Sequence, residues 1–194
     1  MDRICVYCGS SEGRDTEYFE AARALGGTLA ERGIDLVYGG GHVGLMGAVA
    51  DATLDAGGDV YGVMPQALVD REIAHEGVTE LVVVDSMHER KARMADLADG
   101  FVALPGGFGT LEELMEVLTW AQLGFHRDPC GLLDVGGYYA SLVEFFDHQV
   151  EEGFVSADHR RMVVVTADAE VLLDRFADYE PPAVKQFITD PSET

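Results

Sequence analysis

The chain has 194 residues, of which 47% are hydrophobic and 25% charged, a balance typical of an ordinary globular domain. Its 35 acidic and 13 basic residues give a net charge of −22, which disfavours binding to nucleic acid. No apolar stretch is long enough to cross a bilayer, and the N-terminus enters a strand pattern without an export signal. We therefore expect a cytoplasmic protein with no membrane partner.

The basic residues are almost all arginines. Lys91 and Lys185 are the only lysines, and the others are arginines. A surface with many carboxylates and few lysines suits a solvent of very high ionic strength, because salt screens the mutual repulsion. An acidic protein of an ordinary cytosol is an equally good interpretation.

Three cysteines are too few for a disulfide framework. Cys5 and Cys8 form a C-x-x-C pattern, but it falls on an expected strand, where positions three apart face opposite sides. We expect both side chains to pack in the core rather than to bind zinc or undergo redox chemistry. The histidines are scattered, so we expect neither a metal nor a cofactor.

Short β-rich runs alternate with helical patterns along the chain. Strands are expected at 3–8, 34–38, 59–63, 79–84, 100–104, 130–134 and 162–166, and helices at 16–32, 43–56, 87–98, 111–123, 139–152 and 169–177. Most strands are continuous apolar runs, such as Leu81–Val84, which is typical of strands buried on both faces. This predicts an α/β fold, a Rossmann-like doubly wound parallel sheet with helices on both faces. We expect one domain over 1–179 and an extended tail over 180–194.

Ligands of such sheets bind beyond the carboxyl ends of the strands, so the loops there are the places to search. After the second strand, Gly39, Gly41 and Gly44 fit the G-x-G-x-x-G pattern of dinucleotide-binding proteins. The match is weak, because it follows the second strand and no acidic residue ends the next one. A tight turn with close helix packing is the alternative.

The loop after the fifth strand carries three glycines and leads into a helix, with the sequence Pro105-Gly106-Gly107-Phe108-Gly109-Thr110-Leu111-Glu112-Glu113. Glycines let a ligand approach the backbone, and the first helical N–H groups beyond Thr110, the expected N-cap, suit a phosphate. The loop has no Walker lysine, which disfavours NTP binding of the P-loop kind. Alternatively, Thr110 and Glu113 form a capping box, in which Glu113 only caps its own helix.

The loop after the fourth strand opens a helix rich in cations, with the sequence Ser86-Met87-His88-Glu89-Arg90-Lys91-Ala92-Arg93-Met94. Ser86 and Glu89 fit a capping box. Arg90 shares a helix face with Met94, so it is partly sheltered and needs a carboxylate or a phosphate as its partner. Arg90, Lys91 and the following arginine form the strongest positive cluster, which could bind an anion, face solvent or pair with a structural glutamate.

Two segments together, Ser86 to Lys91 and Pro105 to Glu113, resemble the LOG ("Lonely guy") family of cytokinin riboside 5′-monophosphate phosphoribohydrolases. The resemblance runs over nearly the whole chain, from Tyr7-Cys8-Gly9-Ser10-Ser11 to Glu151-Glu152-Gly153-Phe154. It implies a Rossmann-like homodimer that hydrolyses the N-glycosidic bond of an N6-modified AMP to the free base and ribose 5-phosphate. A non-catalytic nucleotide or molybdenum-cofactor carrier on the same scaffold and a general AMP nucleosidase are the alternatives.

The resemblance also implies roles for single residues. Arg90 and Glu113 would be catalytic. Contacts with the nucleotide would come from Glu72, Lys91, Gly107, Phe108, Gly109, Thr110, Leu111, Glu112 and Thr119. The label "lysine decarboxylase" used for similar sequences finds no support, because a pyridoxal enzyme needs a Schiff-base lysine in a suitable cofactor site. Here Lys91 belongs to the R-K pair and Lys185 lies near the tail.

Overall fold

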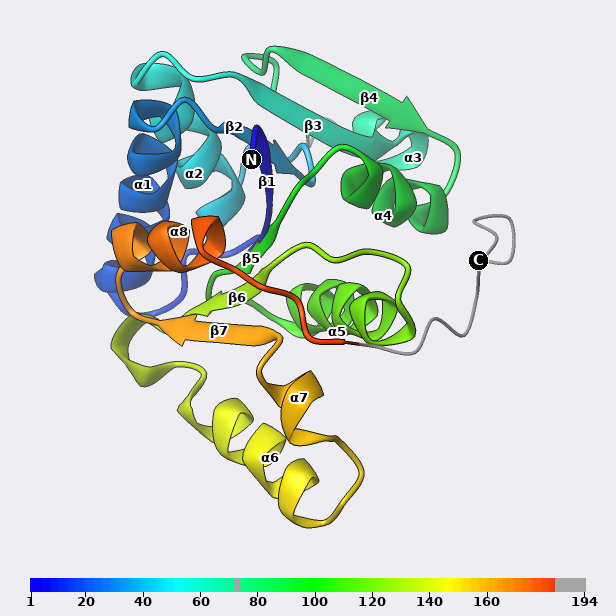
Figure 1. Ribbon diagram of the computed structural model, residues 1–194. Coiled ribbons are helices and arrows are strands. Elements are labelled where there is room, and N and C mark those ends of the chain that lie inside the picture. Colours follow the sequence, from blue (N-terminus) through cyan, green and yellow to red (C-terminus); the bar gives the residue numbers. More distant parts are fainter. Residues whose placement is uncertain (72–73, 184–194) are drawn as a thin grey trace.

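Seven parallel strands form one sheet at the centre of the computed structural model, which describes residues 1–71 and 74–183 (Figure 1). The strands lie in the order β4-β3-β2-β1-β5-β6-β7, and every neighbouring pair is parallel. Their bounds are β1 Arg3–Tyr7, β2 Asp35–Tyr38, β3 Val60–Pro65, β4 Glu80–Val84, β5 Phe101–Ala103, β6 Cys130–Leu133 and β7 Val163–Thr166. This confirms the predicted doubly wound parallel sheet.

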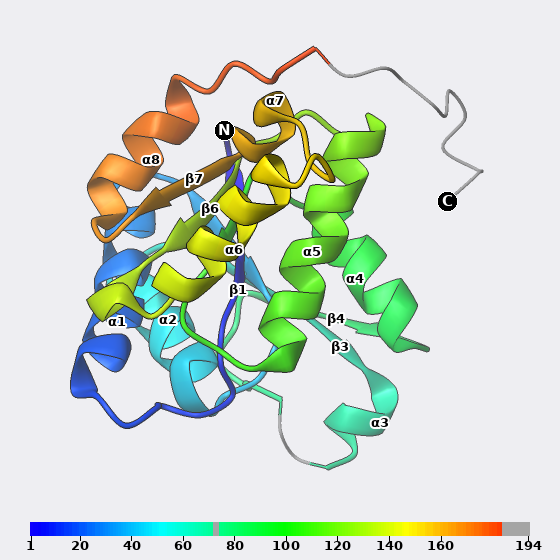
Figure 2. The ribbon, with the colours of Figure 1, turned by 90° about the horizontal axis from the view of Figure 1, so that it is seen from below.

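Helices cover both faces of the sheet (Figure 2). One face carries α1 Thr16–Glu31, α2 Gly44–Asp55 and α8 Ala169–Ala177, and the other carries α4 Met87–Asp96, α5 Phe108–Leu123 and α6 Ala140–Glu151. Three short helices were not predicted, namely α3 Gln66–Val69, η1 Val135–Gly137 and α7 Ala157–Arg160. Within the described ranges, none of the helices has both the length and the apolar character that a membrane span requires.

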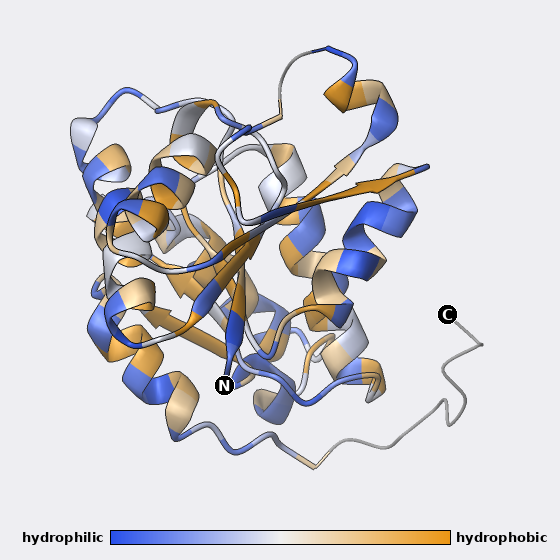
Figure 3. Ribbon diagram, turned by 90° about the horizontal axis from the view of Figure 1, so that it is seen from above, coloured by the Kyte–Doolittle hydropathy of each residue, from blue (hydrophilic) through white to orange (hydrophobic). Residues whose placement is uncertain are grey.

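The central strand β1 is buried on both sides, as its continuous apolar sequence predicts. Ile4 and Val6 pack against α1 and α2, whereas Cys5 and Tyr7 pack on the side of α4 and α5. All four residues are 3% exposed or less. Hydropathy colouring shows the same arrangement over the molecule, with apolar residues gathered on the strands and polar residues on the outer surfaces of the helices (Figure 3).

The expectation that Leu81–Val84 is buried on both faces is wrong. This run forms β4, which lies at the edge of the sheet, and Val83 is 46% exposed. An edge strand has only one neighbouring strand, and the main helix contacts of β4 are with α3 and α4. The apolar run therefore identified the strand but not its position in the sheet.

The sheet has one topological switch point, between β1 and β5. The chain runs outward from β1 through β2 and β3 to β4, and then crosses back to β5 and continues to β7 on the other side. In sheets of this kind, ligands bind at the carboxyl ends of the two strands that flank the switch point. The Gly9 N–H donates to the Pro105 carbonyl across this point at 3.0 Å. The glycine loop at 105–109 thus lies at the switch point.

Candidate active site

The first turn of α4 is fixed by its own side chains. The Ser86 hydroxyl accepts from the Glu89 N–H at 3.1 Å, and the Glu89 carboxylate accepts from the Asp85 N–H at 2.9 Å. This confirms the predicted cap, with the difference that the second bond reaches Asp85 rather than Ser86. Arg90 follows in the next position, and its N–H donates to the Ser86 carbonyl.

Arg90 and Glu113 form a buried ion pair between α4 and α5. Nη1 of Arg90 donates to Oε1 of Glu113 at 2.9 Å, and each side chain is 11% exposed. Nε of Arg90 donates to the carbonyl of Val63, near the end of β3, at 3.0 Å. Arg90 was predicted to need a carboxylate or a phosphate as its partner. The structure gives it a carboxylate, which belongs to Glu113, the other expected catalytic residue.

The N-terminus of α5 differs from its predicted form. The helix begins at Phe108 with Gly107 as its N-cap, three residues before the expected start at 111. Thr110 therefore lies inside the first turn, 4% exposed, and is not the N-cap. The capping-box alternative for Glu113 is wrong as well, because Glu113 lies in the second turn and its carboxylate pairs with Arg90.

The three glycines of the loop have different surroundings. A side chain at Gly106 would overlap the Thr110 hydroxyl and would approach the Gly9 nitrogen to 2.9 Å. A Cβ atom at Gly107 or Gly109 would meet nothing within 4 Å. Gly106 is therefore required for packing, whereas Gly107 and Gly109 border open space at the start of α5, where N–H groups have no partner within the helix.

Two tyrosines that the sequence analysis missed donate hydrogen bonds to the backbone at the start of this loop. Oη of Tyr138 donates to the Gly106 carbonyl at 2.5 Å, and Oη of Tyr139 donates to the Leu104 carbonyl at 2.6 Å. They follow β6 and two glycines with positive φ, Gly136 and Gly137. The signal that could have indicated these tyrosines is the glycine pair directly before them, at the carboxyl edge of the sheet.

Lys91 joins the same two helices as Arg90. Its Nζ donates to carboxylate oxygens of Glu112 and of Glu116, the latter at 3.0 Å, and the side chain is 8% exposed. Burial alone lowers the pKa of Lys91, but the hydrogen bonds that its ammonium donates to the two carboxylates outweigh burial, so the pKa is raised. Lys91 is thus a charged lysine engaged with α5.

The Glu113 carboxyl lies in a weakly solvated place. Burial raises its pKa, and the neighbouring Arg90 guanidinium opposes part of that rise. The charges of Glu113 and Arg90 both act on the thiols of Cys5 and Cys8. Burial has the larger effect, and it raises the pKa of each thiol and keeps it protonated. The two cysteines pack on opposite faces of the sheet, as predicted.

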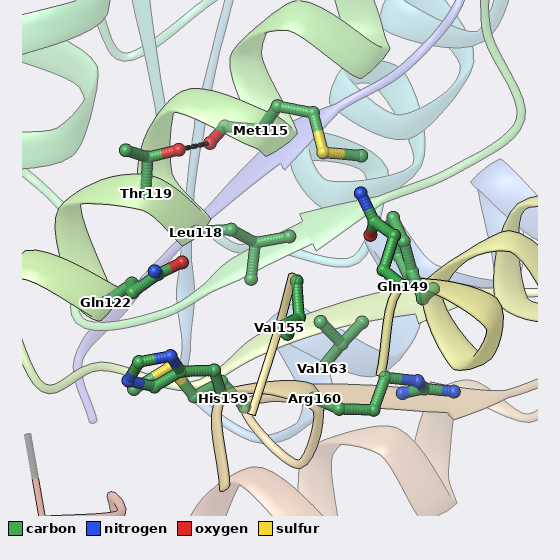
Figure 4. A pocket seen from close by; sticks show the side chains of 11 residues that line it. Met115, Leu118, Thr119, Gln122, Gln149, Val155, His159, Arg160 and Val163 are labelled. Atoms are coloured by element: carbon green, nitrogen blue, oxygen red, sulfur yellow. Dashed lines mark hydrogen bonds between the residues drawn. The ribbon is translucent and has the colours of Figure 1, made fainter. Parts of the chain in front are cut away.

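One other expected contact residue, Thr119, lies apart from this site. Thr119 donates its hydroxyl to the Met115 carbonyl at 2.7 Å and lines a cavity of about 190 Å³ between α5, α6 and α7 (Figure 4). Six residues separate it from Glu113, so the two side chains point about 120° apart around the helix. The cavity includes neither Arg90 nor Glu113. Glu72 lies outside the described residues.

The remaining expected contacts surround the start of α5. Phe108 is 94% exposed at the first helical position, and Glu112 extends to Lys91. Leu111 packs against the core cluster that contains Leu114. In the described part of the chain, no three His, Cys, Asp or Glu side chains form a group that could hold a metal ion.

Comparison with known proteins identifies relatives over most of the chain. A family model described as "possible lysine decarboxylase" matches residues 46–176. A cytokinin riboside 5′-monophosphate phosphoribohydrolase of Arabidopsis thaliana, LOG7, is 56% identical over 92% of this chain and 82% of its own length. The corresponding LOG enzyme of rice (Oryza sativa subsp. japonica) is 54% identical over 92% of this chain and 74% of its own length.

Solved structures share the fold at much lower identity. A molybdenum cofactor binding protein of Rippkaea orientalis matches with a TM-score of 0.69 at 20% identity, over 91% of this chain and 96% of that chain. The molybdenum cofactor carrier protein of Chlamydomonas reinhardtii matches with a TM-score of 0.69 at 21% identity, over 92% and 99%. These structures establish the architecture, and the far closer sequence relatives establish the family. The chain belongs to the LOG family of cytokinin riboside 5′-monophosphate phosphoribohydrolases.

Proposed function

We propose that this protein hydrolyses the N-glycosidic bond of AMP that carries an N6 substituent, such as a cytokinin riboside 5′-monophosphate. The products are the free base and ribose 5-phosphate. The observation that carries the proposal is the buried Arg90–Glu113 pair, which lies beside an open glycine loop at the switch point of the sheet. The relatives at 53–56% identity have this activity in their names.

Breaking the bond between C1′ and the base nitrogen leaves positive charge on the ribose while the bonding electrons depart with the base. The Glu113 carboxylate stabilises that charge and orients the water that attacks C1′. Glu113 must be ionised for this role, and Arg90 favours the ionised form because its guanidinium lies at 2.9 Å. Arg90 is therefore assigned a catalytic role through Glu113 and through contact with the nucleotide.

The 5′-phosphate is assigned to the start of α5. The N–H groups of Phe108, Gly109 and Thr110 lie in the first turn, where a helix attracts anions. The open space at Gly107 and Gly109 allows a phosphate to reach this backbone. The wider set of proposed nucleotide contacts keeps the residues implied by the resemblance, which are Glu72, Lys91, Gly107, Phe108, Gly109, Thr110, Leu111, Glu112 and Thr119.

The carrier alternative has weaker support. The molybdenum cofactor proteins are only 20–22% identical, so they share the fold and not a demonstrated function. A carrier has no need of a buried glutamate whose pKa is raised by burial and whose ionised form is favoured by a neighbouring arginine. The general AMP nucleosidase differs only in the preferred base.

Base release tests the proposal directly. Purified protein is incubated with AMP and with N6-isopentenyl-AMP, at low and at high salt, and free base and ribose 5-phosphate are measured by chromatography. We expect release of both products, faster from the modified nucleotide. Equal rates would identify a general nucleosidase. Nucleotide binding without release at either salt concentration would contradict hydrolysis and favour the carrier.

We also propose that the protein acts as a homodimer in the cytoplasm. Exposed aromatic side chains in and after α6 support a dimer, because Phe145 and Phe154 are 53% and 83% exposed. Leu114 and Ala121 of α5 are buried in the chain's own core and are not available for that contact. Light scattering after size-exclusion chromatography should give twice the chain mass. Three buried free thiols suit a reducing compartment.

A further inference from the structure

Gly39, at the end of β2, lies directly against the guanidinium of Arg90. A Cβ atom built at Gly39 would overlap Nη2 of Arg90 and would lie 3.1 Å from its Cζ. We propose that Gly39 is a positioning residue for Arg90, and that its missing side chain provides the space in which the guanidinium reaches Glu113. This inference rests on the proposed catalytic role of Arg90.

Arg90 cannot move away from a side chain at position 39 without losing one of its hydrogen bonds. Its Nε is held by the Val63 carbonyl at 3.0 Å and its Nη1 by Glu113 at 2.9 Å, so two of its three nitrogens are fixed. Among the described residues, no hydrogen bond reaches Nη2, the nitrogen above Gly39. In the described part of the chain, Nη2 is thus the one guanidinium nitrogen of Arg90 without a hydrogen bond, so it can contact a ligand. A methyl group at position 39 would displace it and break one of the two anchoring bonds.

The cost of a side chain at Gly39 falls on the site rather than on the fold. The three nearest atoms that its Cβ would meet all belong to side-chain ends, two of Arg90 and the sulfur of Met46 at 3.5 Å. The φ angle of Gly39 is not in the left-handed region, so alanine fits the backbone there. Gly47 is a contrasting case, because its Cβ would overlap the backbone carbonyl of His42. Among Gly39, Gly40, Gly44 and Gly47, only Gly39 has Arg90 among the nearest atoms that its Cβ would meet.

A double-mutant cycle tests this role. Turnover of N6-isopentenyl-AMP is measured for wild type, Gly39→Ala, Arg90→Ala and the double variant. We expect Gly39→Ala to lower kcat about 100-fold with a Tm within about 2 °C of wild type. In the Arg90→Ala background the same change should alter kcat less than about threefold, because the group it displaces is absent. Gly27→Ala is the matched control, because a Cβ at Gly27 would meet nothing within 4 Å.

Two results would overturn the proposal. One is wild-type turnover in Gly39→Ala, and the other is an equal loss in both backgrounds, which would mean that the methyl group acts on the substrate or the fold directly. If Gly39→Ala folds only when Arg90 is also replaced, the clash with Arg90 is supported. If it folds in neither background, the crowding involves other groups and the proposal is wrong.

The cycle also separates this inference from the proposed hydrolysis. If the wild type releases no base, the proposed function fails, and the same four proteins are compared by calorimetric titration with AMP. We then expect Gly39→Ala to weaken AMP binding about tenfold in the wild-type background and not in the Arg90→Ala background. Equal weakening in both backgrounds would contradict the positioning role whatever the turnover.

Discussion

Arg90 and Glu113 are a costly pair for a protein to keep. Two charges with 11% exposure have lost most of their hydration, and their mutual attraction barely repays that loss. Apolar side chains of similar volume would stabilise the α4–α5 contact at least as well. The pair therefore makes sense as a preorganised site, in which the carboxylate is poorly solvated and the cation beside it favours the ionised form.

The pH dependence of turnover follows from this environment. Because the pKa of Glu113 is raised above its ordinary 4.5 by burial, a smaller fraction is ionised at a given acid pH. If ionised Glu113 is the active form, the acid limb of the kcat profile lies above pH 4.5. Replacing Arg90 by glutamine removes the charge that opposes the rise, so the limb of the residual activity should move to higher pH. A limb that moves to lower pH would contradict this account.

The elements α4 and α5 are held together by charged side chains beside the site. Lys91 contacts Glu112 and Glu116, which lie one turn apart on α5, while Arg90 contacts Glu113 between them. These three bonds fix the rotation of one helix against the other. The positions of Arg90 and Glu113 thus depend on the whole contact between the helices.

Replacing Lys91 by methionine should loosen this contact. We expect the free energy of unfolding to fall by about 1–2 kcal/mol, less than for a fully buried pair, because Glu112 and Glu116 are 57% and 26% exposed and can regain water. Urea denaturation measures the change. Arg93→Met is the control, since Arg93 is exposed on the same helix and its loss changes the net charge equally. Equal losses for the two variants would show that the ion pairs contribute nothing.

The position of the glycine loop at 105–109 depends on a hydrogen bond from Tyr138. Its hydroxyl donates to the Gly106 carbonyl, and the side chain is 44% exposed, so the carbonyl can be hydrated when the hydroxyl is removed. We expect Tyr138→Phe to cost less than about 1 kcal/mol of stability but to raise KM for the nucleotide about three- to tenfold with kcat nearly unchanged. A fall in kcat with an unchanged KM would place Tyr138 in the chemical step instead.

Most of the fold could be predicted because long elements carry clear periodic patterns. Each strand and each long helix was predicted, and their bounds differ from the structure mainly by one or two residues. The start of α5 was missed because Gly107 and Gly109 are poor helix formers, and their tertiary context overrides that preference. The helices α3, η1 and α7 have four residues or fewer, too few to show a period.

The candidate site was predictable in part. The sequence indicated that Arg90 needs an anionic partner, but only the structure brings Glu113 to it, because that contact depends on how α4 and α5 pack. The space above Gly39 is likewise a tertiary property, since it lies between β2 and the end of a side chain from α4. A glycine pattern in a sequence does not distinguish room for a ligand from room for a neighbouring side chain.

The whole molecule carries a charge of −22, and its arginines neutralise only a part of its carboxylates. Several of the arginines are already paired with carboxylates at the surface. Arg32 pairs with Glu170 and Asp174, and Arg160 pairs with Asp147. The remaining carboxylates repel one another, and salt shortens the range of this repulsion to about 10 Å at 0.1 M.

Salt should therefore stabilise the fold. We expect the Tm to rise by at least about 5 °C between about 0.05 and 2 M NaCl. Sucrose at equal osmolality is the control, because it is excluded from the protein surface without screening charge. A Tm that is constant or highest at low salt would contradict the adaptation of this surface to high ionic strength.

The central claim, that Glu113 acts on the ribose, is tested most directly by turnover of the Glu113→Gln variant. Glutamine keeps the size of the side chain and an acceptor for Arg90 but has no charge. We expect kcat for N6-isopentenyl-AMP to fall about 10²–10⁴-fold, while the Tm and the AMP dissociation constant stay close to wild type. Glu116→Gln, three residues further along the same helix, should keep kcat within about threefold. Wild-type turnover by Glu113→Gln would contradict the account.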